Sequence, residues 1–258
     1  MIARLLGDRR AQAVVRRVDR PQAILLAVVM AALAAVGWLS EPFWLAVVVA
    51  AQLALGGLGA VYLIGPVRPG LGFARYLTLA MAGLALTLFG RLLPAGVALL
   101  LVPAAAILLW IVVFLELRTL HAAGARTALD LLLTVILFSA GAGILALFPE
   151  IAWPPPIILV VVLAFILALR AGEARGTSGG SAVGQALLHG LAVAQVAAAV
   201  TLLDLPGVVG PALVALAFYA WGGAADALQS GASARAVTME FGSLALLGIL
   251  VAIFLHRG

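Results

Sequence analysis

Long, uninterrupted apolar segments fill almost the whole chain and restrict its fold more than any other feature of the sequence. A helix needs about 20 apolar residues to cross the hydrocarbon core of a bilayer. Short groups of proline, glycine and charged residues divide the chain into segments of about that length. The segments cover residues 21–39, 43–65, 73–93, 94–117, 128–148, 154–170, 182–203, 206–227 and 237–255. We therefore expect an all-α integral membrane protein with about nine transmembrane helices.

The composition excludes a water-soluble fold. Hydrophobic residues make up 66% of the 258 residues, and charged residues make up only 10%. Soluble domains are about 45–50% apolar and about 25% charged. The apolar runs are continuous and do not alternate at every second residue, which excludes a transmembrane barrel. We expect residues 1–20 to form a basic cytoplasmic segment and residues 21–258 to form a single polytopic membrane domain.

The arginines indicate how the chain is oriented in the membrane. All 15 basic residues are arginine, and 13 of them fall on one side if each segment crosses the membrane. Arg91 and Arg257 fall on the other side. Cytoplasmic loops carry an excess of basic residues, so we predict a cytoplasmic amino terminus, nine crossings and an outer carboxyl terminus. The chain has the general character of polytopic bacterial proteins, and we place it in a bacterial-type cytoplasmic (inner) membrane.

The same arginines suggest the partners of the inner face. They flank apolar segments, where their usual role is orientation, so the high pI gives no reason to expect nucleic acid as a partner. We expect contacts with membrane lipids, including anionic headgroups. A membrane-protein partner and a homo-oligomer are both compatible with the sequence.

Several landmarks recur about 110 residues apart along the chain. The recurring pairs are Glu41 with Glu150, Trp44 with Trp153, Glu116 with Asp226, Asp130 with Glu240, and Pro94 with Pro206. The spacing suggests a parallel duplication of a four-helix unit, with repeats at 21–127 and 128–235 and a final helix at 237–255. Chance recurrence among regularly spaced helix ends is the alternative interpretation.

Polar side chains within the apolar segments are the candidates for function, because such groups are rare and costly in a membrane. His189 is the titratable residue nearest the middle of a segment, and Gln185 lies one turn earlier on its helix. Our hypothesis for a substrate pathway combines these two residues with Glu240, Asp226 and Tyr219. The alternative is a histidine that is hydrogen-bonded between helices and has no role in transport.

Charged residues also gather where segments meet at the predicted inner face. One set contains Glu116, Arg118, Arg126 and Asp130, and a similar set contains Asp226, Arg235 and Glu240. We expect ion pairs in these sets to fix the inner loops. A cytoplasmic-face site for a cation or a substrate is the alternative interpretation.

The sequence lacks the motifs of several enzyme classes. It contains no HExxH zinc motif, no GxSxG nucleophile elbow and no P-loop. It has no cysteine for a thiolate metal site and no lysine for a Schiff base. His121 and His256 fall on opposite predicted sides, so a three-histidine metal site is also excluded. We therefore expect neither an enzyme nor a bound cofactor or metal.

Two functions fit these observations. The first is a permease-like transport protein for a small or amphipathic solute, which the repeats, the prolines within segments (Pro103 and Pro211) and the polar groups favour. The second is a non-catalytic structural or assembly subunit of a larger membrane complex. The scarcity of buried charge and the lack of a soluble domain favour the second function.

Overall fold

The computed structural model describes residues 21–65, 72–118, 123–147, 155–203, 205 and 207–256. These ranges contain helices and no strand, so the prediction of an all-α fold is confirmed. In chain order the helices are α3 (Pro21–Leu39), α4 (Pro42–Ile64), the single 3-10 turn η1 (Ala74–Tyr76), α5 (Thr78–Gly90), α6 (Ala95–Leu100), α7 (Val102–Arg118), α8 (Ala123–Leu147), α9 (Pro155–Arg175), α10 (Gly179–Leu202), α11 (Val209–Gln229) and α12 (Ala234–His256). The predicted basic segment 1–20 lies outside the described residues.

Seven of the described helices are long and apolar enough to cross a membrane. They are α3, α4, α8, α9, α10, α11 and α12. By length and composition these helices indicate a polytopic membrane protein, as the sequence predicts. Each of the seven covers one of the predicted apolar segments.

The other two predicted segments, 73–93 and 94–117, are not single long helices. α5 has 13 residues and is therefore about 20 Å long, which is short of the hydrocarbon core of about 30 Å. The second segment is divided at Leu101 into α6, with 6 residues, and α7, with 17 residues. Pro103 follows the break, and a proline has no backbone N–H to donate to the carbonyl four residues earlier, here that of Leu99. Helix length therefore supports seven spans, and the count of nine stays a prediction.

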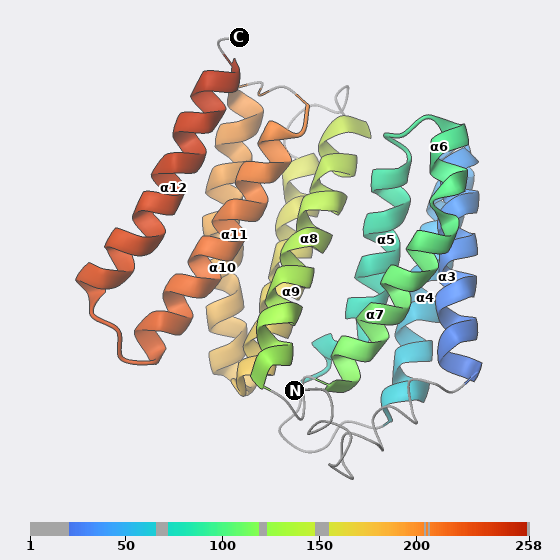
Figure 1. Ribbon diagram of the computed structural model, residues 1–258, viewed down its shortest axis with the longest axis horizontal. Coiled ribbons are helices and arrows are strands. Elements are labelled where there is room, and N and C mark those ends of the chain that lie inside the picture. The colour runs from blue at the N-terminus through green and yellow to red at the C-terminus, as the bar shows by residue number, and fades with distance from the viewer. Residues whose placement is uncertain are drawn as a thin grey trace.

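The helices stand side by side, and successive helices run in opposite directions (Figure 1). The exception is α6, which is followed by α7 in the same direction. α5 lies inside the bundle, where it packs against α3, α4, α7 and α8. Ten of its 13 residues are buried. A short helix at membrane depth is tolerated in this position because neighbouring protein, and not lipid, surrounds its backbone.

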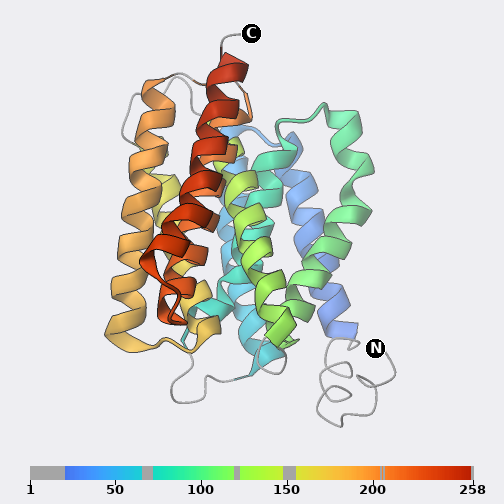
Figure 2. The same ribbon diagram turned by 60° about the vertical axis from the view of Figure 1, so that its left-hand side comes forward.

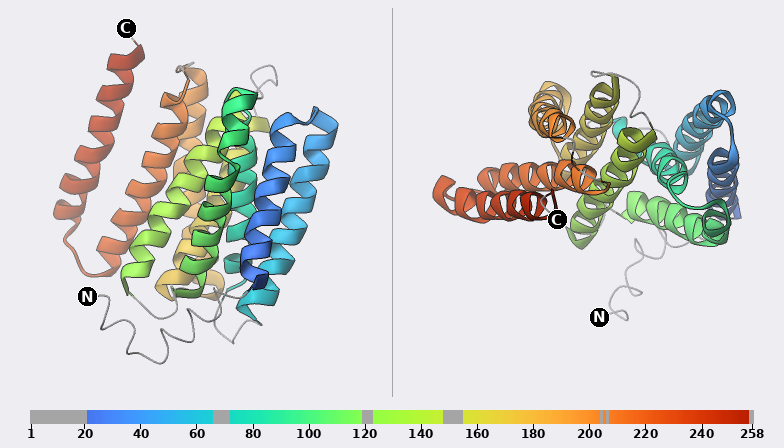
Figure 3. Two further views of the ribbon diagram at one scale, coloured as in Figure 1. Left: turned by 45° about the vertical axis from the view of Figure 1, so that its right-hand side comes forward. Right: turned by 90° about the horizontal axis from the view of Figure 1, so that it is seen from above.

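The contacts define two groups of helices. In the first group, α3 and α5 each pack against both α4 and α7, and in the second, α8 and α10 each pack against both α9 and α11. α5 packs against α8 and joins the groups, while α12 packs against α11. Seen from above, α8 lies at the side of the second group that faces the first (Figure 3). In the turned view, α10 and α12 lie on the left and α3, α6 and α7 lie on the right (Figure 2). The two groups share these neighbours but differ in one contact, because α3 also packs against α5 whereas no comparable contact between α8 and α10 is found in the described ranges. The duplication remains a prediction.

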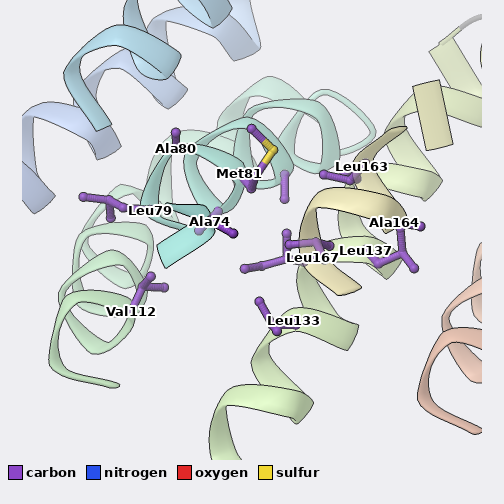
Figure 4. Packing of buried hydrophobic residues seen from close by; sticks show 14 of the residues in the cluster. Ala74, Leu79, Ala80, Met81, Val112, Leu133, Leu137, Leu163, Ala164 and Leu167 are labelled. Carbon is purple, nitrogen blue, oxygen red and sulfur yellow. The ribbon is translucent and has the colours of Figure 1, made fainter. Parts of the chain in front are cut away.

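Apolar side chains from both groups meet where α5 faces α8 and α9 (Figure 4). Leu133 and Leu137 from α8 and Leu167 from α9 are among the largest fully buried side chains. In the close-up they lie opposite Ala74 and Met81 of η1 and α5. Small residues let helices approach closely, as is common in membrane bundles. At Gly56 of α4, an added Cβ would lie 2.8 Å from the Cα of Ala80 of α5.

Candidate functional site

Arginine is concentrated at one end of the bundle. Of the seven arginines in the described ranges, six lie where α4, α7, α9 and α11 end and where the next helices begin. These six are Arg75, Arg118, Arg126, Arg170, Arg175 and Arg235. Arg91 follows α5 at the opposite end. We call the lower end of the bundle in Figure 1 the arginine-rich end.

A cavity of about 660 Å³ lies between α8, α9, α10, α11 and α12. We call it the polar cavity, because charged and polar side chains from all five helices line it. They are Thr127, Asp130, Thr134, Arg175, His189, Tyr219, Asp226, Glu240 and Ser243. Arg175 ends α9 at the arginine-rich end, whereas His189 lies ten residues into α10, about 15 Å along the helix axis. The polar cavity therefore extends from the arginine-rich end into the bundle.

Arg175 is the cation of the polar cavity. Its Nη2 lies 3.3 Å from Oδ1 of Asp130, and its Nε lies 3.5 Å from Oδ1 of Asp226. One guanidinium thus faces two carboxylates that come from α8 and α11. Its place in the last turn of α9 is favourable, because a cation there interacts with the negative end of the helix dipole.

His189 lines the polar cavity and also makes a contact between helices. The ring is 5% exposed, and Nε2 lies 2.8 Å from the backbone oxygen of Phe218 on α11. A carbonyl oxygen only accepts, so Nε2 carries the hydrogen, and Nδ1 of the neutral ring holds a free lone pair. The ring also packs on the Phe218 ring, with centroids 4.3 Å apart. Gly222 leaves room for the imidazole, since an added Cβ would lie 3.3 Å from Cε1 of His189.

Glu240 and Tyr219 complete the predicted pathway residues that reach the polar cavity. Glu240 lines it from α12 and is exposed, and within the described ranges we find no ion pair for this carboxylate. Tyr219 lines it from α11 and is partly exposed. Gln185 is half-buried on α10 and is not among the lining residues. Four of the five pathway residues proposed from the sequence therefore share one cavity.

A second set of charges lies nearby but is buried. Arg170 of α9 donates from Nε and Nη2 to the carboxylate of Glu116 on α7, and the shortest distance is 2.6 Å. The two side chains are 5% and 2% exposed. Next to them, Glu173 accepts a hydrogen bond from the backbone nitrogen of Ala74 at 3.1 Å. This cluster connects α9 to α7 and η1, and therefore connects the two groups of helices.

The ion pairs thus run to α9, whereas the sequence suggested pairs within each inner-face set. Glu116 pairs with Arg170, and Asp130 and Asp226 both pair with Arg175. The remaining arginines of the sets behave differently. Arg118 lies over the ring of Phe114 at 5.5 Å, while Arg126 and Arg235 are exposed and have no ion pair within the described ranges. The reason is that the end of α9 lies beside α7, α8 and α11, so its two arginines reach carboxylates on all three helices.

An apolar cavity of about 610 Å³ lies between α10, α11 and α12. Leu203, Leu213 and Ile249 are among its lining residues, and Gln195 is its polar member. The apolar cavity lies nearer the opposite end of the bundle from the arginine-rich end, because its residues fall late in α10 and α12 and early in α11. α12 therefore has a polar cavity along the start of its length and an apolar one along the rest.

The histidine and carboxylate side chains of the polar cavity are residue types that can also bind metal ions. In the described part of the chain, no three His, Asp or Glu residues are grouped as metal ligands. Comparisons with protein families, curated proteins and solved structures find no match to this chain.

Proposed function

We propose that this chain is a permease-like transport protein for a small or amphipathic solute, and that the polar cavity belongs to its pathway. The observation that carries the proposal is the convergence of charged and polar side chains from five helices on one cavity. Polar groups at membrane depth usually face a bundle interior or a water-filled space, and they often mark substrate pathways. The volume also falls in the range of small-molecule sites, about 300–1,000 Å³.

The proposal includes the topology in the membrane. We take η1 with α5, and α6 with α7, as two further crossings, so that the chain crosses nine times. The alternating helix directions support this count, because each crossing then runs between the arginine-rich end and the opposite end of the bundle. The excess of arginine assigns the arginine-rich end to the cytoplasmic side. The polar cavity would then lie on the cytoplasmic side of a bacterial-type inner membrane, and no catalytic role is proposed for its residues.

The topology can be tested by labelling, because the natural chain has no cysteine. Ala122→Cys and Ala152→Cys should react from opposite sides of the membrane with a reagent that cannot cross it. Residue 122 is expected on the cytoplasmic side. Labelling of both positions from the same side would contradict the nine-crossing topology.

Transport can be tested with purified protein in proteoliposomes, in an uptake screen of small cationic, neutral and anionic solutes. We expect the wild type to take up at least one solute. His189→Leu should lower that uptake about tenfold or more, because a loss of about 1.4 kcal/mol in solute binding already gives a factor of ten.

The matched control for this test is Thr201→Val on the same helix. The Thr201 hydroxyl is exposed and contacts backbone oxygens of its own helix, so its removal should leave uptake unchanged. Wild-type uptake that equals that of empty liposomes for every solute class would count against transport.

A non-catalytic subunit of a larger membrane complex is the second candidate function, and α12 favours it. This helix packs mainly against α11, and only 11% of its apolar window is buried. Leu246, Leu250 and Phe254 are among its exposed side chains. A partner helix could cover this face, and co-purification of a stoichiometric membrane protein in mild detergent would favour the subunit.

A further inference from the structure

The polar cavity carries an excess of negative charge. Asp130, Asp226 and Glu240 contribute three carboxylates, and Arg175 contributes one guanidinium. With a neutral His189, two formal negative charges remain uncompensated among the lining residues. Asp226 and Glu240 are exposed to solvent, and the remaining negative charge favours a bound cation over an anion by electrostatic complementarity. An anionic solute would meet Arg175 only together with its two carboxylate partners.

Aromatic rings lie beside these carboxylates. Phe218 and Tyr219 line the polar cavity from α11, and Phe241 lines it from α12. Gly223 lets α11 and α12 approach closely at this level, since an added Cβ would lie 2.5 Å from the Phe241 ring. The face of an aromatic ring attracts cations, and carboxylates combined with aromatic faces are typical of sites for organic cations.

His189 adds a hydrogen-bond acceptor. Its ring is more than nine-tenths buried, lines the polar cavity and carries its hydrogen on Nε2. Within the described ranges no hydrogen bond is found to Nδ1, whose lone pair can accept one in the neutral ring. A protonated primary or secondary amine has N–H groups to donate to this acceptor. A quaternary ammonium group has none.

We propose that the polar cavity binds protonated organic amines that carry an apolar or aromatic group. The ammonium group lies among the carboxylates and His189, and the apolar part lies against Phe218, Phe241 and Leu244. This assignment names the solute class for the proposed transport function and rests on it. It follows from the charge balance, the aromatic lining and the free acceptor together.

The test is equilibrium binding to the purified wild type in lipid nanodiscs at pH 7, with four probes of similar size. They are phenethylamine, its N,N,N-trimethyl derivative, phenethyl alcohol and phenylacetate. We expect phenethylamine to bind most tightly. Phenethyl alcohol lacks the positive charge and the carboxylates of the cavity repel phenylacetate, so both should bind about tenfold or more weakly. The affinity of the trimethyl derivative should lie between that of phenethylamine and those of the two other probes, because it keeps the positive charge but lacks the N–H donors.

Variants locate the binding site. Asp226→Asn and Glu240→Gln should each weaken phenethylamine binding several-fold, and the double variant should remove its preference over phenethyl alcohol. Glu41→Gln is the matched control, because Glu41 is an exposed carboxylate before α4 at the opposite end of the bundle. Equal binding of all four probes by the wild type would overturn the proposal, and so would unchanged selectivity in the double variant.

Uptake of the same probes by proteoliposomes separates this proposal from the transport function. Selective binding of phenethylamine without uptake of any solute would support the amine site and contradict transport. Uptake of phenylacetate or phenethyl alcohol as fast as that of phenethylamine would support transport and overturn the amine assignment.

Discussion

The two groups of helices use buried polar side chains in different ways. In the first group, Gln52 is fully buried, and its Oε1 accepts a hydrogen bond from the hydroxyl of Thr87 at 2.9 Å. Trp38 donates to the backbone oxygen of Leu86 at 2.9 Å. Arg91 donates to two backbone oxygens at the end of α3, at 2.7 and 2.6 Å. In each case the polar side chain has a protein partner.

In the second group the polar side chains surround a cavity. His189 uses one ring nitrogen for Phe218, and Arg175 is shared between two carboxylates. Asp226 is 60% exposed even though it pairs with Arg175. The comparison teaches that a polar residue in a membrane span does not by itself indicate function. The cavity beside the polar side chains is what distinguishes the second group, because buried polar atoms without a hydrogen-bond partner, such as Oγ1 of Thr78 and Nε1 of Trp110, also occur in the first.

The largest expected effect concerns the buried ion pair that joins the groups. Glu116→Ala leaves the Arg170 guanidinium buried without this carboxylate, which should lower the free energy of unfolding by about 3–5 kcal/mol. Asp226→Ala breaks a partly exposed pair in the second group and should cost about 0–1 kcal/mol. Thermal or SDS unfolding in detergent measures both. Equal losses in the two variants would contradict the difference in burial between these two ion pairs.

Close packing in the first group gives the next largest effect. Gly56→Leu places side-chain atoms against the backbone of Ala80 and should destabilise the protein by about 1–3 kcal/mol or more, because α4 and α5 must move apart. The neighbouring Gly57→Leu is the matched control, since no atom lies within 4 Å of an added Cβ there. Similar melting temperatures for the two variants would contradict the α4–α5 contact.

The smallest expected losses of stability are those of Gln52→Leu and His189→Leu. Measuring uptake in these two variants shows which of the two buried polar groups takes part in transport. Gln52→Leu removes the interhelical hydrogen bonds to Thr87 and to the backbone oxygen of Met30, and it should cost only about 0.6–2 kcal/mol because such bonds are weak in membranes. His189→Leu should cost about as much for the same reason. Uptake per folded protein should stay unchanged in Gln52→Leu and fall in His189→Leu. A loss of uptake in Gln52→Leu would show that the first group also takes part.

The helical membrane fold and four of the residues that line the polar cavity could be predicted from the amino-acid sequence alone. A run of about 20 apolar residues forms a membrane helix through local hydropathy, so the seven long helices could be read directly from the chain. His189, Asp226, Glu240 and Tyr219 could be selected because polar groups in such runs are rare. The landmark spacing also predicted a duplication of a four-helix unit, and this duplication stays a prediction.

Which side chains meet depends on the tertiary structure. Arg170 and Arg175 lie five residues apart on α9, yet Arg170 faces Glu116 of α7 while Arg175 faces Asp130 and Asp226. Gln185 and His189 lie one turn apart on α10, yet only His189 reaches the polar cavity. Apolar residues pack almost equally well against lipid and against protein, so hydropathy does not fix the lateral order or rotation of helices. Those are set by long-range packing, such as the contact of Gly222 with His189, and this packing decides which polar groups share a cavity.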